Sequence, residues 1–111
     1  METNKAPIPT KKDLEKQIIT VLKTIFDPEI PVDIYELGLI YEINVKDDFD
    51  VEVVMTLTSP SCPVAESMPS EVEQKVSGMW SVKSAKVNLV WEPTWNKDMM
   101  SEEAMLELGF L

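Results

Sequence analysis

The sequence contains no histidine, no arginine and only one cysteine, Cys62. Without histidine the chain cannot form a Ser–His or Cys–His catalytic pair, and it lacks both an ordinary catalytic zinc site and an imidazole base near neutral pH. A single cysteine cannot form an internal disulfide, which indicates a reducing compartment, and we expect a cytoplasmic protein. The absences therefore exclude the commonest hydrolytic and zinc-dependent active sites.

Positive charge and long apolar runs are also scarce. Ten lysines stand against 20 acidic residues, which gives a formal net charge of -10. Such a charge, without arginine, disfavours nucleic acids and anionic membranes and favours basic protein partners or metal ions. No apolar run is long enough to cross a bilayer, and the start of the chain has no apolar segment typical of a signal peptide. We expect neither a nucleic-acid nor a membrane partner.

The length of 111 residues indicates one domain. Residues 1–9 contain Pro7 and Pro9 and are expected to form a flexible tail, so the predicted domain covers residues 10–111.

Helical spacing of apolar residues predicts two long helices and one short one. The first starts after the cap Thr10 and should end at Pro28. The second starts at Pro63 and ends near Gly78, with Pro69 predicting a kink or restart near Ser67. A short helix capped by Ser101 should end at Gly109, with Met105, Leu106 and Leu108 as its apolar residues.

Alternating patterns predict three strands, residues 39–45, 51–58 and 85–91. In the first, Leu39, Tyr41, Ile43 and Val45 are expected to share one face. The first two strands form a hairpin through the turn at 46–50. The predicted fold is α+β, a two-layer sandwich of order α-β-β-α-β-short α, with two long helices on one face of a three-stranded sheet. The position of the third strand in the sheet is left open.

Residues 27–38 contain too many prolines for a strand and too many apolar residues for a free linker. We expect an ordered loop with one helical turn at residues 33–37, in which Asp27 and Asp33 cap or form turns. The spacing of its acids does not match a calcium-binding loop.

Cys62 lies between the end of the second strand and the start of the second helix. Helix N–H groups and the hydroxyls of Thr58, Ser59 and Ser61 favour a reactive thiolate at this position, whereas Glu66 and the net charge oppose it. A buried thiol acting as a small apolar filler is the alternative interpretation. The sign of any pKa shift is left open by the sequence.

Three blocks of the sequence, taken together, resemble the metal–sulfur cluster assembly factor family. The blocks are Asp27-Pro28-Glu29-Ile30-Pro31-Val32 leading to Leu37-Gly38-Leu39-Ile40-Tyr41, then Thr56-Leu57-Thr58-Ser59-Pro60-Ser61-Cys62-Pro63, and then Pro93-Thr94-Trp95. That family includes SufT-like and PaaD-like bacterial proteins and the eukaryotic cytosolic iron–sulfur targeting component. The resemblance covers residues 14–111.

The resemblance implies a role in maturing iron–sulfur proteins, with Cys62 as the reactive cysteine and a transient iron–sulfur ligand. Asp27, Glu29, Thr58 and Trp95 match motif positions of the family and are expected to frame the site, together with Ser59 and Ser61. PaaD-like relatives often carry an additional cysteine-rich segment, and this sequence has no second cysteine to supply one.

One thiol cannot hold a cluster that usually takes four thiolates. We therefore expect no permanently bound cofactor, and a transient cluster only if another thiol donor shares it. The implied partners are iron–sulfur carrier or scaffold proteins and recipient apoproteins, and a homodimer is left open. We expect an accessory factor and not an enzyme. The alternatives are a thiol-based redox protein and a protein-interaction module in which the cysteine is incidental.

Overall fold

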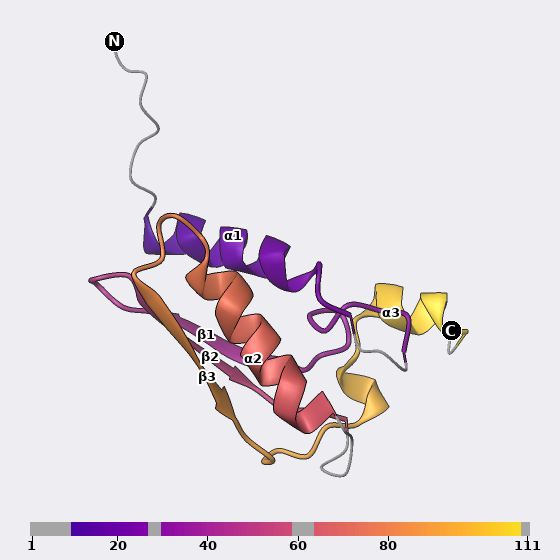
Figure 1. The fold of residues 1–111 in the computed structure, drawn as a ribbon. Helices are drawn as coiled ribbons and strands as arrows, with labels where there is room; N and C mark the ends of the chain where they lie inside the picture. The colour runs from indigo at the N-terminus through magenta and orange to yellow at the C-terminus, as the bar shows by residue number, and fades with distance from the viewer. Residues whose placement is uncertain (1–9, 27–29, 59–63, 110–111) are drawn as a thin grey trace.

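Strand β2 (Asp50–Met55) is the centre of a three-stranded sheet in the computed structural model, which describes residues 10–26, 30–58 and 64–109 (Figure 1). Strand β1 (Ile40–Val45) pairs with it antiparallel through the turn at 46–50, as predicted. Strand β3 (Ser84–Leu89) pairs with its other edge in parallel, so the strand order is β1-β2-β3. The long connection through the second helix thus returns the chain to the free edge of β2.

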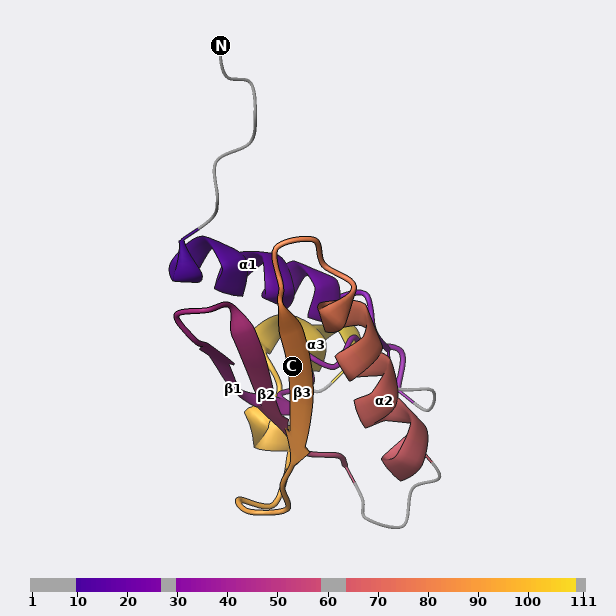
Figure 2. The same cartoon turned by 60° about the vertical axis from the view of Figure 1, so that its left-hand side comes forward.

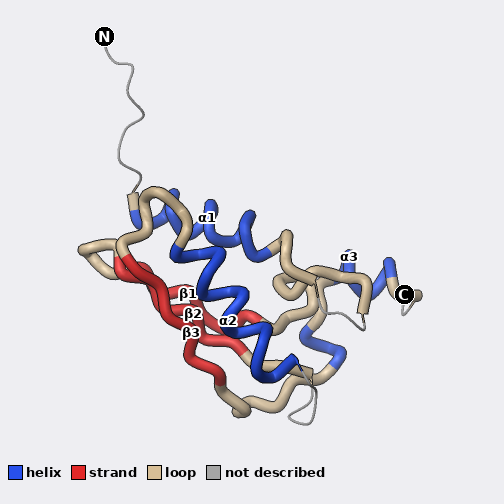
Figure 3. The backbone as a smooth tube through the Cα atoms, viewed as in Figure 1, coloured by secondary structure: helices blue, strands red, loops and turns tan. Residues whose placement is uncertain are grey.

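Two helices, α1 (Lys11–Leu22) and α2 (Val64–Ser77), cover one face of this sheet, and Figures 2 and 3 show both helices on the same side of the strands. Val51, Val53 and Met55 of β2 point into the core because alternate strand residues share a face. From the helices, the core takes Leu14, Ile18, Leu22, Met68, Val72 and Val76. The predicted two-layer α+β sandwich is confirmed.

Helix α1 begins as expected and ends earlier than predicted. The Thr10 hydroxyl accepts a hydrogen bond from the N–H of Asp13 at 3.1 Å, which caps the helix. The helix ends at Leu22 and not at Pro28, because Ile25 leaves the helical path and its carbonyl accepts the N–H of Ile34 at 2.8 Å. Pairing with the following loop therefore replaces the last helical turn.

Helix α2 runs through Pro69 without a break, so a restart near Ser67 does not occur. A proline inside a helix removes one backbone hydrogen bond, and here the buried stripe of Met68, Val72 and Val76 continues across it. Tertiary packing of that stripe holds the helix together through this position.

The predicted face of β1 is wrong at one point. Ile40 lies opposite Met55 and Ile43 lies opposite Val53, with an irregularity between Ile40 and Glu42. Directly opposed residues share a face, so Ile40 joins Ile43 toward the core, and Tyr41 is the extra residue of a β-bulge. Alternation alone does not show such an insertion.

The C-terminal part forms a 3₁₀ turn, η1 (Lys97–Met99), and helix α3 (Glu102–Glu107), capped by the Ser101 hydroxyl. Leu106, one of the apolar residues of this helix, is 65% exposed, and Ala104 packs into the core. Strand β3 ends at Leu89, two residues earlier than predicted, which leaves Trp91 39% exposed. None of the helices in the described part of the chain is long and apolar enough to span a membrane.

Candidate functional site

Two of the predicted site residues, Thr58 and Trp95, lie in the described part of the chain. Cys62, Asp27, Glu29, Ser59 and Ser61 lie outside the described residues. Thr58 is half-buried, two residues after the last backbone pairing of β2, and Val64 is the first residue of α2. These two residues bound the segment that carries the cysteine.

The structure brings the three sequence blocks together at one end of the sheet. Thr56, which opens the cysteine block, donates its backbone N–H to the carbonyl of Leu39 at 2.9 Å. The indole Nε1–H of Trp95 donates to the carbonyl of Leu37 at 2.8 Å. The Tyr41 hydroxyl donates to the carbonyl of Pro93 at 2.6 Å. Segments far apart in the sequence are thus tied to each other directly.

Gly38 makes this junction sterically feasible. Its φ of +83° is in the region that only glycine adopts readily, and an added Cβ would lie 2.2 Å from the carbonyl oxygen of Met99. The backbone of η1 therefore lies directly against the loop before β1. Trp95 packs against the core beside it, so it contributes to the scaffold as core cover.

A groove of about 580 Å³ opens beside this junction, and we call it the sheet groove. Its apolar lining comes from β1, β2, and the segments after β3: Tyr41, Val54, Val90, Pro93 and Met99. Glu42 lies opposite Val54, away from the core-facing Val53 and Met55, so the groove is on the face of the sheet that α1 and α2 leave open. Glu42 and Glu92 supply its charges.

Tyr41 and Thr56 form the polar part of the same region. Partial burial raises the pKa of the Tyr41 hydroxyl above its ordinary value, and the Glu92 carboxylate adds to this rise while Thr56 opposes it. Thr56 is only 1% exposed, and its Oγ1 makes no well-formed hydrogen bond within the described part of the chain. The Tyr41 hydroxyl thus stays protonated and available as a donor to Pro93.

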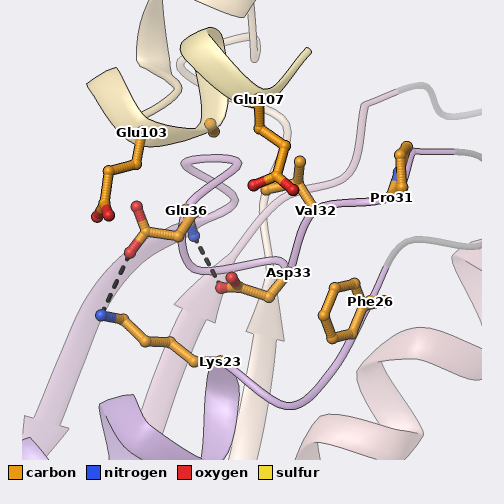
Figure 4. A pocket seen from close by; sticks show the side chains of 9 residues that line it. Lys23, Phe26, Pro31, Val32, Asp33, Glu36, Glu103 and Glu107 are labelled. Carbon is orange, nitrogen blue, oxygen red and sulfur yellow. Dashed lines mark hydrogen bonds and ion pairs between the residues drawn. The ribbon is translucent and has the colours of Figure 1, made fainter.

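A second hollow, of about 340 Å³, lies between the end of α1, the loop before β1 and α3, and we call it the acidic cleft. Figure 4 shows Glu103 and Glu107 of α3 facing Asp33 and Glu36 of the loop, with Lys23 and Phe26 on the opposite wall. The nearest predicted framing residues in sequence, Asp27 and Glu29, lie outside the described residues.

Two of the four carboxylates of the acidic cleft, Asp33 and Glu36, are engaged in contacts within the protein. Glu36 forms an ion pair with Lys23 at 3.3 Å, and a hydrogen bond from the Ser101 side chain, followed by this lysine, lowers the pKa of the carboxyl. The same carboxylate raises the pKa of Lys23. Asp33 accepts the N–H groups of Tyr35 and Glu36 at 3.1 and 3.0 Å, which confirms its predicted capping role. Asp33 and Glu36 therefore hold the loop in place, whereas Glu103 and Glu107 of α3 form no ion pair with a lysine of the described ranges.

No cluster of three or more potential metal-ligating side chains occurs among residues 10–26, 30–58 and 64–109.

Sequence reasoning identified Trp95 and missed Gly38, Tyr41 and Thr56 as parts of the junction. Gly38 and Tyr41 stand in the first family-like block and Thr56 in the second, so the signal was present in the blocks themselves. The sequence did not predict the β-bulge that directs Tyr41 to Pro93.

The chain belongs to the iron–sulfur cluster assembly protein family, because the model of that family matches residues 15–89. The match includes the first two of the three sequence blocks and ends before the third.

Among its relatives, an Fe-S protein maturation auxiliary factor of Porphyromonas gingivalis is 56% identical over 97 residues, covering 87% of this chain and 92% of that protein. The Fe-S protein maturation auxiliary factor SufT of Staphylococcus aureus is 41% identical and covers 77% of this chain and 97% of its own length. The crystal structure of a DUF59 domain from Bacillus anthracis superposes with a TM-score of 0.83 at 35% identity, covering 90% of this chain and 95% of that one.

Proposed function

We propose that this protein is a non-enzymatic accessory factor that helps to assemble or deliver iron–sulfur clusters, with Cys62 as the thiol that contacts iron during handover. The observation that carries the proposal is the convergence of the three family-like blocks at one end of the sheet through the Leu39–Thr56, Leu37–Trp95 and Tyr41–Pro93 hydrogen bonds. The names of the relatives, which describe maturation of Fe-S proteins, support the same role.

The number of thiols limits the mechanism. An iron–sulfur cluster usually takes four thiolates, and this chain supplies one. Cys62 therefore acts as one ligand of a shared cluster, and the remaining ligands come from a second protomer, a small thiol, a carrier or the recipient apoprotein. Cluster or iron passes through the site as cargo, so the protein needs affinity for partners more than a complete ligand set.

Cells lacking the protein test this role directly. We expect the activities of iron–sulfur enzymes to fall in such cells, to recover with the wild-type chain and to remain low with Cys62→Ala. Immunoblots that compare the level of the Cys62→Ala variant with that of the wild-type chain control for loss of the variant. Normal enzyme activities in both the deletion and the Cys62→Ala cells would defeat the proposal.

Alkylation measures the thiol itself. Because Cys62 is the only cysteine, uptake of iodoacetamide by the native chain reports this residue alone. A reactive thiolate gives a titration midpoint below the free-thiol value of about 8.5. If modification waits for unfolding by urea, Cys62 is a buried filler.

Anaerobic mixing with iron, sulfide and a small thiol separates the proposal from a thiol-based redox protein. Contact with a cluster predicts a visible absorbance that is lost in Cys62→Ala. A redox protein predicts reversible oxidation of Cys62 by peroxide without such absorbance, and it would need an external resolving thiol because the chain has no second cysteine.

A further inference from the structure

The sheet groove is the surface most suited to a partner protein, and we propose that it binds a segment that places an apolar side chain in the groove and lysine or arginine side chains against Glu42 and Glu92. The inference adds a partner chemistry to the proposed function and depends on that function only for the identity of the partner. None of the residues that line the sheet groove is a predicted iron ligand.

The shape of the groove is fixed before anything binds. The Tyr41–Pro93 hydrogen bond joins its β1 wall to the segment after β3, and the contact of Gly38 with the Met99 backbone holds the third wall. A preformed pocket loses less conformational freedom on binding than a mobile one. Its volume of about 580 Å³ lies in the range of sites that take apolar groups.

The lining favours an apolar side chain of adaptable shape. Val54, Val90 and Met99 contribute aliphatic and thioether surface, and methionine adjusts readily to different partners.

The carboxylates at the groove determine which charge its partner should carry. Glu42 and Glu92 stand at the groove, and Asn44 donates hydrogen bonds at 3.2 Å to both Glu42 and Glu52 on the same open face. Within the described ranges, no lysine forms an ion pair with Glu42 or Glu92, in contrast to Glu36 in the acidic cleft. Glu52 lies opposite Lys86 of β3, so Glu42 and Glu92 are the carboxylates of the groove without a counter-charge. A basic segment supplies the missing counter-charges.

A second copy of the chain fits this surface poorly. In a twofold symmetric contact each groove would face its own copy, which would bring Glu42, Glu52 and Glu92 against identical carboxylates. The net charge of -10 adds to this repulsion. The charge pattern therefore favours a different, basic protein.

A random nonapeptide library displayed on phage and selected against the full-length chain tests the chemistry of the occupant. We expect selected peptides to combine Leu, Ile or Met with flanking Lys or Arg. The strongest peptide, synthesised, should shift the backbone amide signals of Val54, Val90 and Met99 in a ¹⁵N-labelled sample. Its affinity should fall at least fivefold between 50 and 300 mM NaCl, because exposed charge pairs are screened.

Two variants with the same change in charge locate the site. Glu92→Lys should weaken the peptide at least fivefold, whereas Glu107→Lys on the acidic cleft should leave its affinity within twofold. Val90→Asp should abolish binding without changing the far-ultraviolet circular dichroism, and a loss of fold in that variant leaves Glu92→Lys as the deciding measurement.

The proposal is overturned by selection of acidic peptides or of none, by equal effects of the two lysine variants, or by signal shifts confined to the acidic cleft. Concentration-dependent dimerisation with shifts at Val54 and Val90 in the absence of peptide would identify a second copy as the occupant and overturn it as well. Each of these results is independent of Cys62, so normal iron–sulfur enzyme activities in both the deletion and the Cys62→Ala cells would end the proposed function and leave the groove to be judged by binding alone.

Discussion

The acidic cleft and the sheet groove differ in how their charges are used. In the cleft, Glu36 pairs with Lys23 and accepts a hydrogen bond from Ser101, and Asp33 caps the turn that follows it. In the groove, the carboxylates of Glu42 and Glu92 border apolar surface and have no lysine partner among the described residues. The number of acidic residues alone therefore does not mark a binding surface. Carboxylates already engaged in holding three segments together have little left to offer a partner.

Gly38 links the two regions, and its replacement should have the largest effect. In Gly38→Ala the new Cβ meets the Met99 carbonyl and φ remains unfavourable, so we expect a loss of about 3 kcal/mol in the free energy of unfolding by urea. Gly109→Ala is the matched control, because φ is +84° and nothing lies within 4 Å of the added Cβ. It should lose about 1 kcal/mol. Equal losses in the two variants would show that the close approach of η1 is not needed.

Trp95→Phe tests whether the junction depends on the indole hydrogen bond. The variant keeps an aromatic ring and leaves the Leu37 carbonyl without its donor, which should cost about 1.5 kcal/mol in urea unfolding. Trp91→Phe removes an exposed indole and should change stability by less than about 0.5 kcal/mol. If Trp95→Phe is as stable as Trp91→Phe, the indole hydrogen bond does not stabilise the junction, and side-chain packing alone holds it.

Thr56→Val should increase stability, in contrast to the two previous changes. Its buried Oγ1 has no well-formed hydrogen bond with the described groups, so replacing the hydroxyl by a methyl should raise the free energy of unfolding by about 1 kcal/mol. Thr20→Val, at an exposed position on α1, serves as the control for the change in side chain. A destabilised Thr56→Val would mean that the hydroxyl bonds to Tyr41 in solution.

Glu36→Gln should have the smallest effect, and that effect should depend on pH. The pKa of Glu36 is lowered from its ordinary value of 4.5, so the stabilisation is fully present above about that pH and is lost as the pH falls through the folded pKa. Because Glu36 is 16% exposed and Lys23 is more exposed, we expect a difference from wild type of only about 0.5 kcal/mol at pH 7. Urea unfolding from pH 7 to pH 3 should show this difference disappear. Glu107→Gln, at an exposed position on the same cleft, is the control for removing one negative charge.

Much of the fold follows from local patterns. The Thr10 cap, the stripe of Met68, Val72 and Val76, and the alternation of β2 each predicted an element that the structure contains. The errors arose where tertiary contacts decide the outcome. Ile25 leaves α1 to pair with Ile34, and the bulge at Tyr41 changes the face of β1. The Ile25–Ile34 pairing and the bulge at Tyr41 both depend on residues outside the segment whose structure they change.

The candidate site, like the fold, could be predicted only in part. Motif resemblance pointed to Cys62 and to the framing residues, because those positions stand in short, ordered blocks. The sheet groove could not be predicted, since it depends on bringing residues 38–42, 54 and 90–99 to one end of the sheet. Which edge of β2 receives β3 decides whether Val90 reaches that end, and the sequence left this choice open.

The uneven exposure of the three tryptophans gives the molecule a built-in optical reporter. Trp80, in the turn between α2 and β3, is 74% exposed and Trp91 is 39% exposed, whereas Trp95 packs into the junction. In a Trp80→Phe background the remaining indole emission comes only from Trp91 and Trp95. Loosening of the junction would then appear as a red shift from Trp95, with the exposed Trp91 as an internal reference and without any attached dye.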